Sequence, residues 1–287
     1  MFNEENKNQP VLLAVLAHPD DESFGMGGTL AYYAQNGVRT ELVCATKGEV
    51  GEMDPKYLHD NLTSADVRVQ ELRCAAGILG LSYIHFLDYR DSGMTGSTDN
   101  QHPKALCNQP VTQVAAEVAD IIRKVKPNVV VTFDPIGGYR HPDHIAIHQA
   151  AVEAYKLAAD PDFKGSGLPP YQPDKLVYNT FPKTMMRLMI RMMKLFGKDP
   201  TKFGQNQDID LASIAEVTFP IHYKINYRSV EKERDAASAC HASQGGGGLT
   251  GGIIGFFRRF FTPYETYMQA IPEYADRRIQ KDFFTGS

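Results

Sequence analysis

Cysteine is scarce in this chain of 287 residues, and the few that occur are scattered. No two of them form a C-x-x-C pair, and their spacing matches neither a zinc knuckle nor a disulfide framework. A free cysteine packs as a small hydrophobic residue, so we expect reduced and mostly buried thiols, which favours a cytoplasmic protein. The four residues are Cys44, Cys74, Cys107 and Cys240.

Long apolar runs and a strong charge of either sign are also missing. No run approaches the roughly 18 apolar residues that span a bilayer. The polar residues 1–10 lack the features of an export signal, and we expect a flexible tail there. The formal net charge of -4 gives no reason to expect a nucleic-acid partner. Because the sequence lacks a G-x-G-x-x-G loop and a nucleophile elbow, hydride and phosphoryl transfer are disfavoured.

Strand-like and helix-like segments alternate along most of the chain. This alternation predicts a Rossmann-like α/β fold, in which a mostly parallel sheet carries helices on both faces. We expect residues 11–287 to form one domain, with a C-terminal α/β extension from about residue 165 covering the site. The predicted strands are 11–17, 40–46, 83–87, 128–133, 175–180 and 216–221, and the predicted helices are 23–35, 63–79, 111–125 and 144–159.

The first predicted strand ends abruptly in polar residues. The apolar run 11–17 is followed by HPDDE at 18–22. Pro19 stops the strand because it cannot extend the hydrogen-bond ladder. In open α/β sheets the ligand crevice lies beyond the carboxyl ends of the strands, so a histidine and several carboxylates at this point are placed for chemistry.

A second histidine stretch, HPDH at 141–144, follows another predicted buried strand. Proline suits the first position of a helix, so Pro142 places His141 at the helix entry. His144 then lies one turn further on and projects to the same side. The sequence therefore brings two histidine-rich strand ends to one edge of the sheet.

These strand ends together contain a set of metal ligands. A catalytic divalent ion needs about three protein ligands and one open position. His18, Asp21 and His144 supply such a set, which suits zinc, with Fe²⁺ or another divalent ion as alternatives. A pair of His144 with His148 on one helix face is the rival set, but it leaves Asp21 without a role.

Several motifs occur in order over about residues 11–150: AHPDDE at 17–22, TKGEVG at 46–51, an Arg68-x-x-Glu71 helix and HPDH at 141–144. Together they resemble the PIG-L/LmbE-like family of metal-dependent N-acetylglucosaminyl deacetylases. DSGM at 91–94 and Tyr139 resemble the branch that acts on glucosaminyl-inositol thiol precursors or conjugates, and HASQ at 241–244 is a weaker echo.

The resemblance implies an activity and a ligand set. It makes His18, Asp21 and His144 the metal ligands and Asp20 the general base, in a hydrolase that removes acetyl from an N-acetylglucosaminyl-type substrate. One alternative is an amidase of thiol-sugar conjugates, and another is a sugar-binding protein that keeps the metal without turnover. A binder has no use for an unligated Asp20. The expected partner is a small N-acyl amino sugar, and a homo-oligomer is left open.

Further roles follow from the matching positions. His141 or the Tyr139 hydroxyl is the candidate oxyanion donor, and we expect Asp143 to hold His141 as an imidazolium. Either Asp20 or His141 protonates the departing amine.

Three other polar residues are candidates for substrate contacts. The resemblance makes Arg68 a contact to sugar hydroxyls, although an arginine on a helix face is often only solvated. Asp91 either bonds a sugar hydroxyl or starts a turn, and Glu49 bonds at the site or caps a helix. Glu22 is expected to be structural.

The C-terminal half contains a basic amphipathic helix over 183–198, with Arg187, Arg191 and Lys194 at helical spacing. Its apolar face comprises Met185, Leu188, Met189, Met192 and Phe196. We favour a helix packed on the body, or a lid over a hydrophobic aglycone, with a membrane surface or a partner's groove as the alternative. The glycine-rich 244–255 and the aromatic 256–261 predict a mobile loop and an aromatic plug.

Overall fold

The structure, a computed structural model, describes residues 9–58, 61–181, 183–202, 210–246 and 263–284, without the side chains of Thr184 and Met185. The predicted tail over 1–8, most of the glycine-rich loop and the aromatic segment 256–261 therefore lie outside the described residues. The strands are β1 (Val11–Leu16), β2 (Arg39–Thr46), β3 (Tyr83–Tyr89), β4 (Val129–Phe133), β5 (Lys175–Thr180), β6 (Tyr223–Asn226) and β7 (Tyr264–Ile271). The helices are α1 (Asp21–Gln35), α2 (Ser64–Leu79), α3 (Val111–Val125), α4 (Gly137–Arg140), α5 (Pro142–Ala159), α6 (Lys183–Leu195), α7 (Leu211–Glu216) and α8 (Glu231–Cys240).

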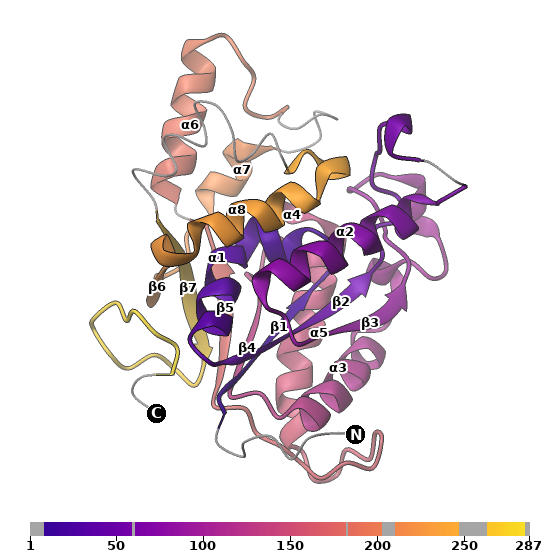
Figure 1. Cartoon of the computed structure of the whole chain (residues 1–287), viewed down its shortest axis with the longest axis vertical. Coiled ribbons are helices and arrows are strands. Elements are labelled where there is room, and N and C mark those ends of the chain that lie inside the picture. Colours follow the sequence, from indigo (N-terminus) through magenta and orange to yellow (C-terminus); the bar gives the residue numbers. More distant parts are fainter. Residues whose placement is uncertain (1–8, 59–60, 182, 203–209, 247–262, 285–287) are drawn as a thin grey trace.

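The strands form one sheet in the order β3-β2-β1-β4-β5-β7-β6 (Figure 1). β1 to β5 pair in parallel, whereas β7 is antiparallel to both β5 and β6. This confirms the predicted mostly parallel α/β sheet. The strand order reverses between β1 and β4, and in doubly wound sheets the ligand crevice lies at such a point.

Strand β1 explains why both faces of the sheet carry helices. All six of its residues are buried, and successive side chains point to opposite faces. Leu12 and Ala14 belong to the core beneath α1, α2 and α8, while Leu13 and Val15 belong to the core beneath α3 and α5. A strand covered on both faces reads as a continuous apolar run, which is the pattern that the sequence shows.

Of the two helices nearest the site, α1 begins two residues before its predicted start, whereas α5 begins at Pro142, as the proline at the helix entry indicated. α1 begins at Asp21, so that Asp21 and Glu22 occupy its first turn, where carboxylates interact favourably with the helix dipole. α5 begins at Pro142 with His141 at its N-cap position, because a proline needs no hydrogen-bond partner in the first turn. Both helices therefore carry carboxylate or histidine side chains at their amino ends.

The C-terminal strand predictions are only partly right. The strand predicted over 216–221 is wrong, because α7 ends at Glu216 and β6 begins only at Tyr223. Pro220 lies in this run and cannot donate to a ladder. β7 was not predicted, and it lies between β5 and β6 as a strand from near the end of the chain.

The prediction of reduced cysteines is wrong for two of the four. Cys74 near the end of α2 and Cys240 at the end of α8 form a disulfide with a Cα–Cα distance of 6.0 Å, while Cys44 and Cys107 are free. α2 and α8 lie against each other, which brings together residues that are 166 positions apart. Sequence spacing cannot reveal such a pair, and one argument for a cytoplasmic location is lost.

Candidate active site

The loops after β1 and β4 meet where the strand order reverses, and the predicted metal ligands lie together there. His18 Nδ1 is 3.2 Å from His144 Nε2. Asp21 completes the group, with its carboxylate oxygens 3.6 Å from His18 Nδ1 and 3.2 Å from His144 Nε2. All three side chains are at least nine-tenths buried. Two strand ends more than a hundred residues apart thus form one cluster.

The hydrogen bonds around this cluster leave lone pairs facing one another. His144 Nδ1 lies 3.2 Å from the Gly137 carbonyl and donates to it, so its Nε2 carries a lone pair. His18 Nε2 lies 3.2 Å from Asp143 Oδ2, so in the neutral imidazole, the form that binds a metal, Nε2 donates to Asp143 and Nδ1 carries the lone pair. Two imidazole lone pairs and the Asp21 carboxylate, whose Oδ2 also accepts the His18 backbone N–H at 2.7 Å, then converge, which is the arrangement that a divalent cation satisfies.

Two other groups of ligand atoms, each within 4.8 Å, share His18: one with His141 and His144, the other with Asp91, His141 and Asp143. His141 Nδ1 already accepts the Asp143 backbone N–H at 3.1 Å, which favours Asp21 as the third ligand. A His/Asp cluster that could hold a metal ion is therefore present.

The carboxylates around His18 favour positive charge in this pocket. Burial disfavours an imidazolium, but the charge of Asp91 and hydrogen bonds to Asp143 and Asp21 outweigh it and raise the pKa of His18 well above its ordinary value. A site with such an excess of negative charge attracts a cation.

Asp20 lies beside the cluster in a strained backbone conformation. Its φ of 118° is in a region that residues other than glycine rarely adopt. Arg68 Nη2 donates to Asp20 Oδ2 at 3.1 Å, and the Asp20 N–H donates to Glu22 Oε2 at 3.0 Å. Burial, assisted by the charge of Asp21 and opposed by that of Arg68, raises the pKa of Asp20 to about 6. Such a pKa suits a group that both accepts and returns a proton near neutrality.

Arg68 is an organising residue of the site and not a solvated helix side chain. It is 4% exposed, and Nη2 also donates to the Pro19 carbonyl at 2.7 Å. Nη1 donates to the Gly48 carbonyl at 3.3 Å, and a Cβ at Gly48 would overlap the guanidinium. The TKGEVG loop therefore needs this glycine so that its backbone can pass close to the arginine. Nε of Arg68 has no partner among the described residues.

Asp143 is bonded differently from the expectation. Its carboxylate accepts hydrogen bonds from the Ser92 N–H at 2.8 Å and the Ser92 hydroxyl, in addition to that from His18. The predicted imidazolium at His141 is also not supported, because burial and the positive charges of His18 and His144 lower the pKa of His141 well below its ordinary value. Asp143 thus orients His18, and Ser92 is a site residue that the sequence analysis did not single out.

Asp91 and Glu49 support each other at the rim of the cluster. Asp91 Oδ1 is 3.5 Å from His18 Nε2 and accepts from the Gly93 N–H at 2.8 Å. Although it is buried, the charge of His18 and these hydrogen bonds lower the pKa of Asp91. Glu49 accepts the Asp91 backbone N–H at 3.0 Å, which favours a structural role for Glu49 in this loop.

The aromatic neighbours hold the histidines in place. Phe133 stacks on His144 with 3.9 Å between ring centroids, and Tyr139 packs edge-on against His144 at 4.9 Å. Burial raises the pKa of the Tyr139 hydroxyl, which keeps it protonated as a hydrogen-bond donor. His148 points elsewhere, since its Nδ1 bonds the Phe133 carbonyl at 2.8 Å and its ring contacts Tyr178. The rival ligand pair of His144 and His148 is thus disfavoured.

A buried ion pair behind Asp20 was missed from the sequence. Glu22 and His241 are fully buried, and His241 Nε2 lies 2.7 Å from Glu22 Oε1. Ser23 Oγ donates to the same oxygen at 2.6 Å. In the sequence, only the weak family resemblance of HASQ at 241–244 pointed to His241. Glu22 therefore links the backbone of Asp20 to the C-terminal half of the chain.

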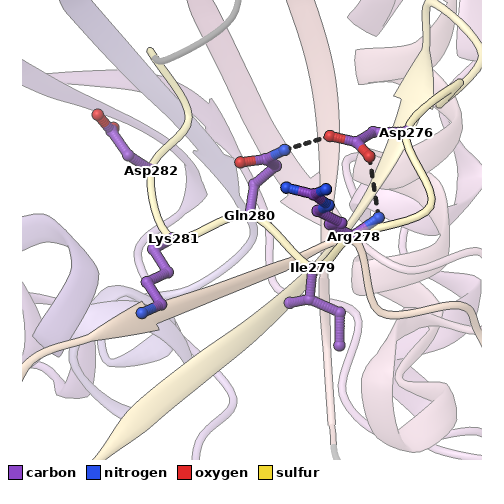
Figure 2. Close-up of a pocket in the computed structure, with 6 residues that line it drawn as sticks. All are labelled: Asp276, Arg278, Ile279, Gln280, Lys281 and Asp282. Atoms are coloured by element: carbon purple, nitrogen blue, oxygen red, sulfur yellow. Dashed lines mark hydrogen bonds between the residues drawn. The ribbon is translucent and has the colours of Figure 1, made fainter.

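The structure has two notable cavities near the surface. One of about 510 Å³ lies between the loop of residues 52–57 and the turn of residues 242–245, whose Ser243 is bonded to Glu71 of α2. The other, of about 530 Å³, is formed by the loop after β7, where Asp276 accepts hydrogen bonds from Gln280 and Arg278 (Figure 2). Neither cavity is lined by the histidines or carboxylates of the cluster, so neither is assigned to the substrate.

Comparison with known proteins agrees with this geometry. The family described as GlcNAc-PI de-N-acetylase, PIG-L, matches residues 13–155. A 1D-myo-inositol 2-acetamido-2-deoxy-alpha-D-glucopyranoside deacetylase of Streptomyces scabiei is 43% identical, over 81% of this chain and 76% of that protein. The protein of the same name from Geodermatophilus obscurus is 34% identical, over 81% and 82%. The chain belongs to the PIG-L family.

Solved structures resemble this chain over nearly its whole length. An N,N'-diacetylchitobiose deacetylase from Pyrococcus horikoshii covers 94% of this chain and 87% of its own, with a TM-score of 0.63 and 22% identity. A 4-carboxy-2-hydroxymuconate hydratase from Pseudomonas putida KT2440 covers 94% and 100%, with a TM-score of 0.62 and 21% identity. At such identities the likeness concerns the fold, and the reaction must be argued from the site.

Proposed function

We propose that this protein is a metal-dependent N-deacetylase that releases acetate from an N-acetylglucosaminyl-type substrate, as the names of its relatives describe for glucosaminyl-inositol. The observation that carries the proposal is the convergence of two imidazole lone pairs and a carboxylate beside Asp20. We assign His18, Asp21 and His144 as the ligands of a divalent ion, zinc or Fe²⁺.

Asp20 is the general base in this proposal. A divalent ion bound by the three ligands supplies Lewis acidity and lowers the pKa of water towards ~7. Asp20 takes a proton from the attacking water as the new C–O bond forms at the amide carbonyl carbon. The C–N bond then breaks, acetate leaves, and the departing amine nitrogen receives a proton from Asp20, which took it up from the water. His141 is the alternative donor, although burial and the neighbouring histidines lower its pKa. General base catalysis of this kind contributes about 10² to 10⁴ in rate.

The other side chains position the reacting groups. Tyr139, protonated and packed beside the ligand His144, is the candidate donor to the developing oxyanion. Asp143 orients His18 and is itself fixed by Ser92. Arg68 holds Asp20, and its guanidinium is a candidate contact to a sugar hydroxyl. Asp91 Oδ2 lies 4.0 Å from Arg68 Nη1 and is the candidate acceptor.

Two variants distinguish the role of a metal ligand from the role of the general base. Asp20→Asn keeps the shape of the side chain and lies outside the ligand set, so we expect full metal content and a loss of about 10² to 10⁴ in kcat. His144→Ala should lose both metal and activity. Metal content is measured by elemental mass spectrometry on the purified proteins, and equal metal loss in the two variants contradicts the assigned roles.

An amine-release assay identifies the substrate. The panel contains N-acetylglucosaminyl-inositol, N,N'-diacetylchitobiose and a thiol-sugar conjugate, each with wild-type protein and Asp20→Asn. Chelation should abolish release, and Zn²⁺, Fe²⁺ or Co²⁺ should restore it. Faster cleavage of the conjugate favours the amidase alternative, and metal binding without release from any substrate favours the sugar-binding alternative.

A further inference from the structure

Helix α6 exposes an apolar strip to solvent. Leu188, Met192, Leu195 and the following Phe196 are 56%, 44%, 75% and 71% exposed. Their separations of three and four residues place them on one side of the helix. Single exposed apolar residues are ordinary, but a row of large ones indicates a contact surface.

A basic strip runs beside the apolar one. Arg187, Arg191 and Lys194 are exposed and recur at helical spacing. The sequence from 183 to 198 contains five basic residues and no acidic one, although the whole chain has a formal net charge of -4. The outward surface of α6 therefore combines apolar area with local positive charge.

The inner side of α6 is already in contact with the protein. Met186, Ile190 and Met193 are half-buried, and Lys183 Nζ donates to the Ile214 carbonyl of α7 at 3.0 Å. Figure 1 shows α6 at one end of the molecule, beyond α7. The rest of the described helix surface is exposed and carries both the apolar and the basic strip.

We propose that α6 docks the protein on the surface of an anionic lipid bilayer. The apolar strip enters the boundary between headgroups and acyl chains, and the basic strip lies at the level of the lipid phosphates. A nucleic acid would leave the apolar strip in water, and a symmetric second copy would oppose like charges. No described helix is long and apolar enough to cross a bilayer, so the contact is with the surface. The proposal does not depend on the reaction proposed above.

The experiment uses the full-length protein and sucrose-loaded vesicles. Co-sedimentation is measured with phosphatidylcholine alone and with phosphatidylcholine containing 30% phosphatidylglycerol. Two double variants are compared with wild type: L195Q/F196Q removes part of the apolar strip, and R191Q/K194Q removes two charges. Since each basic residue near an anionic surface changes the partition coefficient about fivefold, the charge variant should bind about 25-fold more weakly.

A matched control removes two charges elsewhere. Lys124 and Lys126 are exposed at the C-terminal end of α3, so K124Q/K126Q changes the net charge equally without touching α6. We expect wild type and this control to bind anionic vesicles alike, and both α6 variants to bind weakly while keeping the wild-type Tm.

Several outcomes would overturn the proposal. These are absence of binding to anionic vesicles at low salt, equal loss in the control, and unchanged binding of both α6 variants. A dimer in sedimentation velocity that L195Q/F196Q converts to monomer would assign the strip to a second copy. Retention of the wild type, but not of that variant, by an acidic peptide with no binding to vesicles would assign it to a protein partner.

Discussion

Replacing Glu22 with glutamine should lower kcat, although Glu22 is not one of the proposed metal ligands. Its Oε2 accepts the backbone N–H of Asp20 at 3.0 Å, and its Oε1 faces Ser23 and His241. In Glu22→Gln, with the amide oxygen facing Ser23 and His241, the NH₂ group faces the Asp20 N–H, and two donors then oppose each other. Asp20 loses the contact that holds its backbone.

The size of the effect follows from two terms. A hydrogen bond to a charged group contributes about 1.5–3 kcal/mol, and an unfavourable backbone conformation such as that of Asp20 costs about 1–3 kcal/mol. Because the terms are similar, removal of the bond frees Asp20 to relax away from its strained φ of 118°. We expect kcat to fall about 10- to 100-fold, which corresponds to about 1.4–2.7 kcal/mol in the activation barrier.

The assay is steady-state acetate release, with metal content and Tm measured on the same preparations. The matched control is Glu265→Gln. Glu265 also accepts backbone N–H groups of α1, from Gly28 at 3.0 Å and Thr29 at 2.7 Å, but further along the helix. It should lose stability while keeping kcat.

Two results would refute this reasoning. A wild-type kcat in Glu22→Gln would mean that Glu22 does not position Asp20. An equal fall of kcat in the Glu265→Gln control would mean that general destabilisation of α1, and not the local bond, causes the loss. Lost metal in Glu22→Gln would assign the effect to the ligands.

Two further predictions concern contacts around the site. Cys74→Ser should lower the free energy of unfolding by about 2–5 kcal/mol in urea denaturation, because the disulfide closes a long loop; a reductant should lower the wild type equally and leave the variant unchanged. Ser92→Ala removes the hydroxyl donor to Asp143 and keeps the backbone N–H donor, so it should cost about 1–3 kcal/mol in kcat/KM. Ser97→Ala, which alters a turn in the same loop, should keep activity, and similar kcat/KM values in the two variants would count against Asp143 as a positioning residue.

The sequence predicts the proposed metal ligands better than it predicts the residues that hold them in place. The sequence predicts that His18 and His144 lie close together, because both follow buried strands whose carboxyl ends lie at the same edge of a parallel sheet. The start of α1 was misplaced by two residues, and Pro142 correctly marked the start of α5. The order of motifs then identified the family.

The contacts that sequence reasoning missed are long-range and lack a local pattern. Glu22 and His241 are 219 positions apart, and no periodicity links them. Asp143 was expected to hold His141 from the matching positions of the resemblance, but residues two apart at a helix start point about 200° apart, and its carboxylate reaches Ser92 and His18 instead. Such partners depend on how the loops pack and not on the type of each segment.

The position of β7 has a consequence for the order of assembly. Residues Tyr264–Ile271 are synthesised last among the strands, yet they lie between β5 and β6, and Phe283 close to the C-terminus is fully buried. Until the ribosome has released this part of the chain, β5 is an open edge and β6 has no neighbour in the sheet. A nascent chain therefore depends on residues 264–271 to close the sheet, and a chain truncated before them would be prone to aggregation.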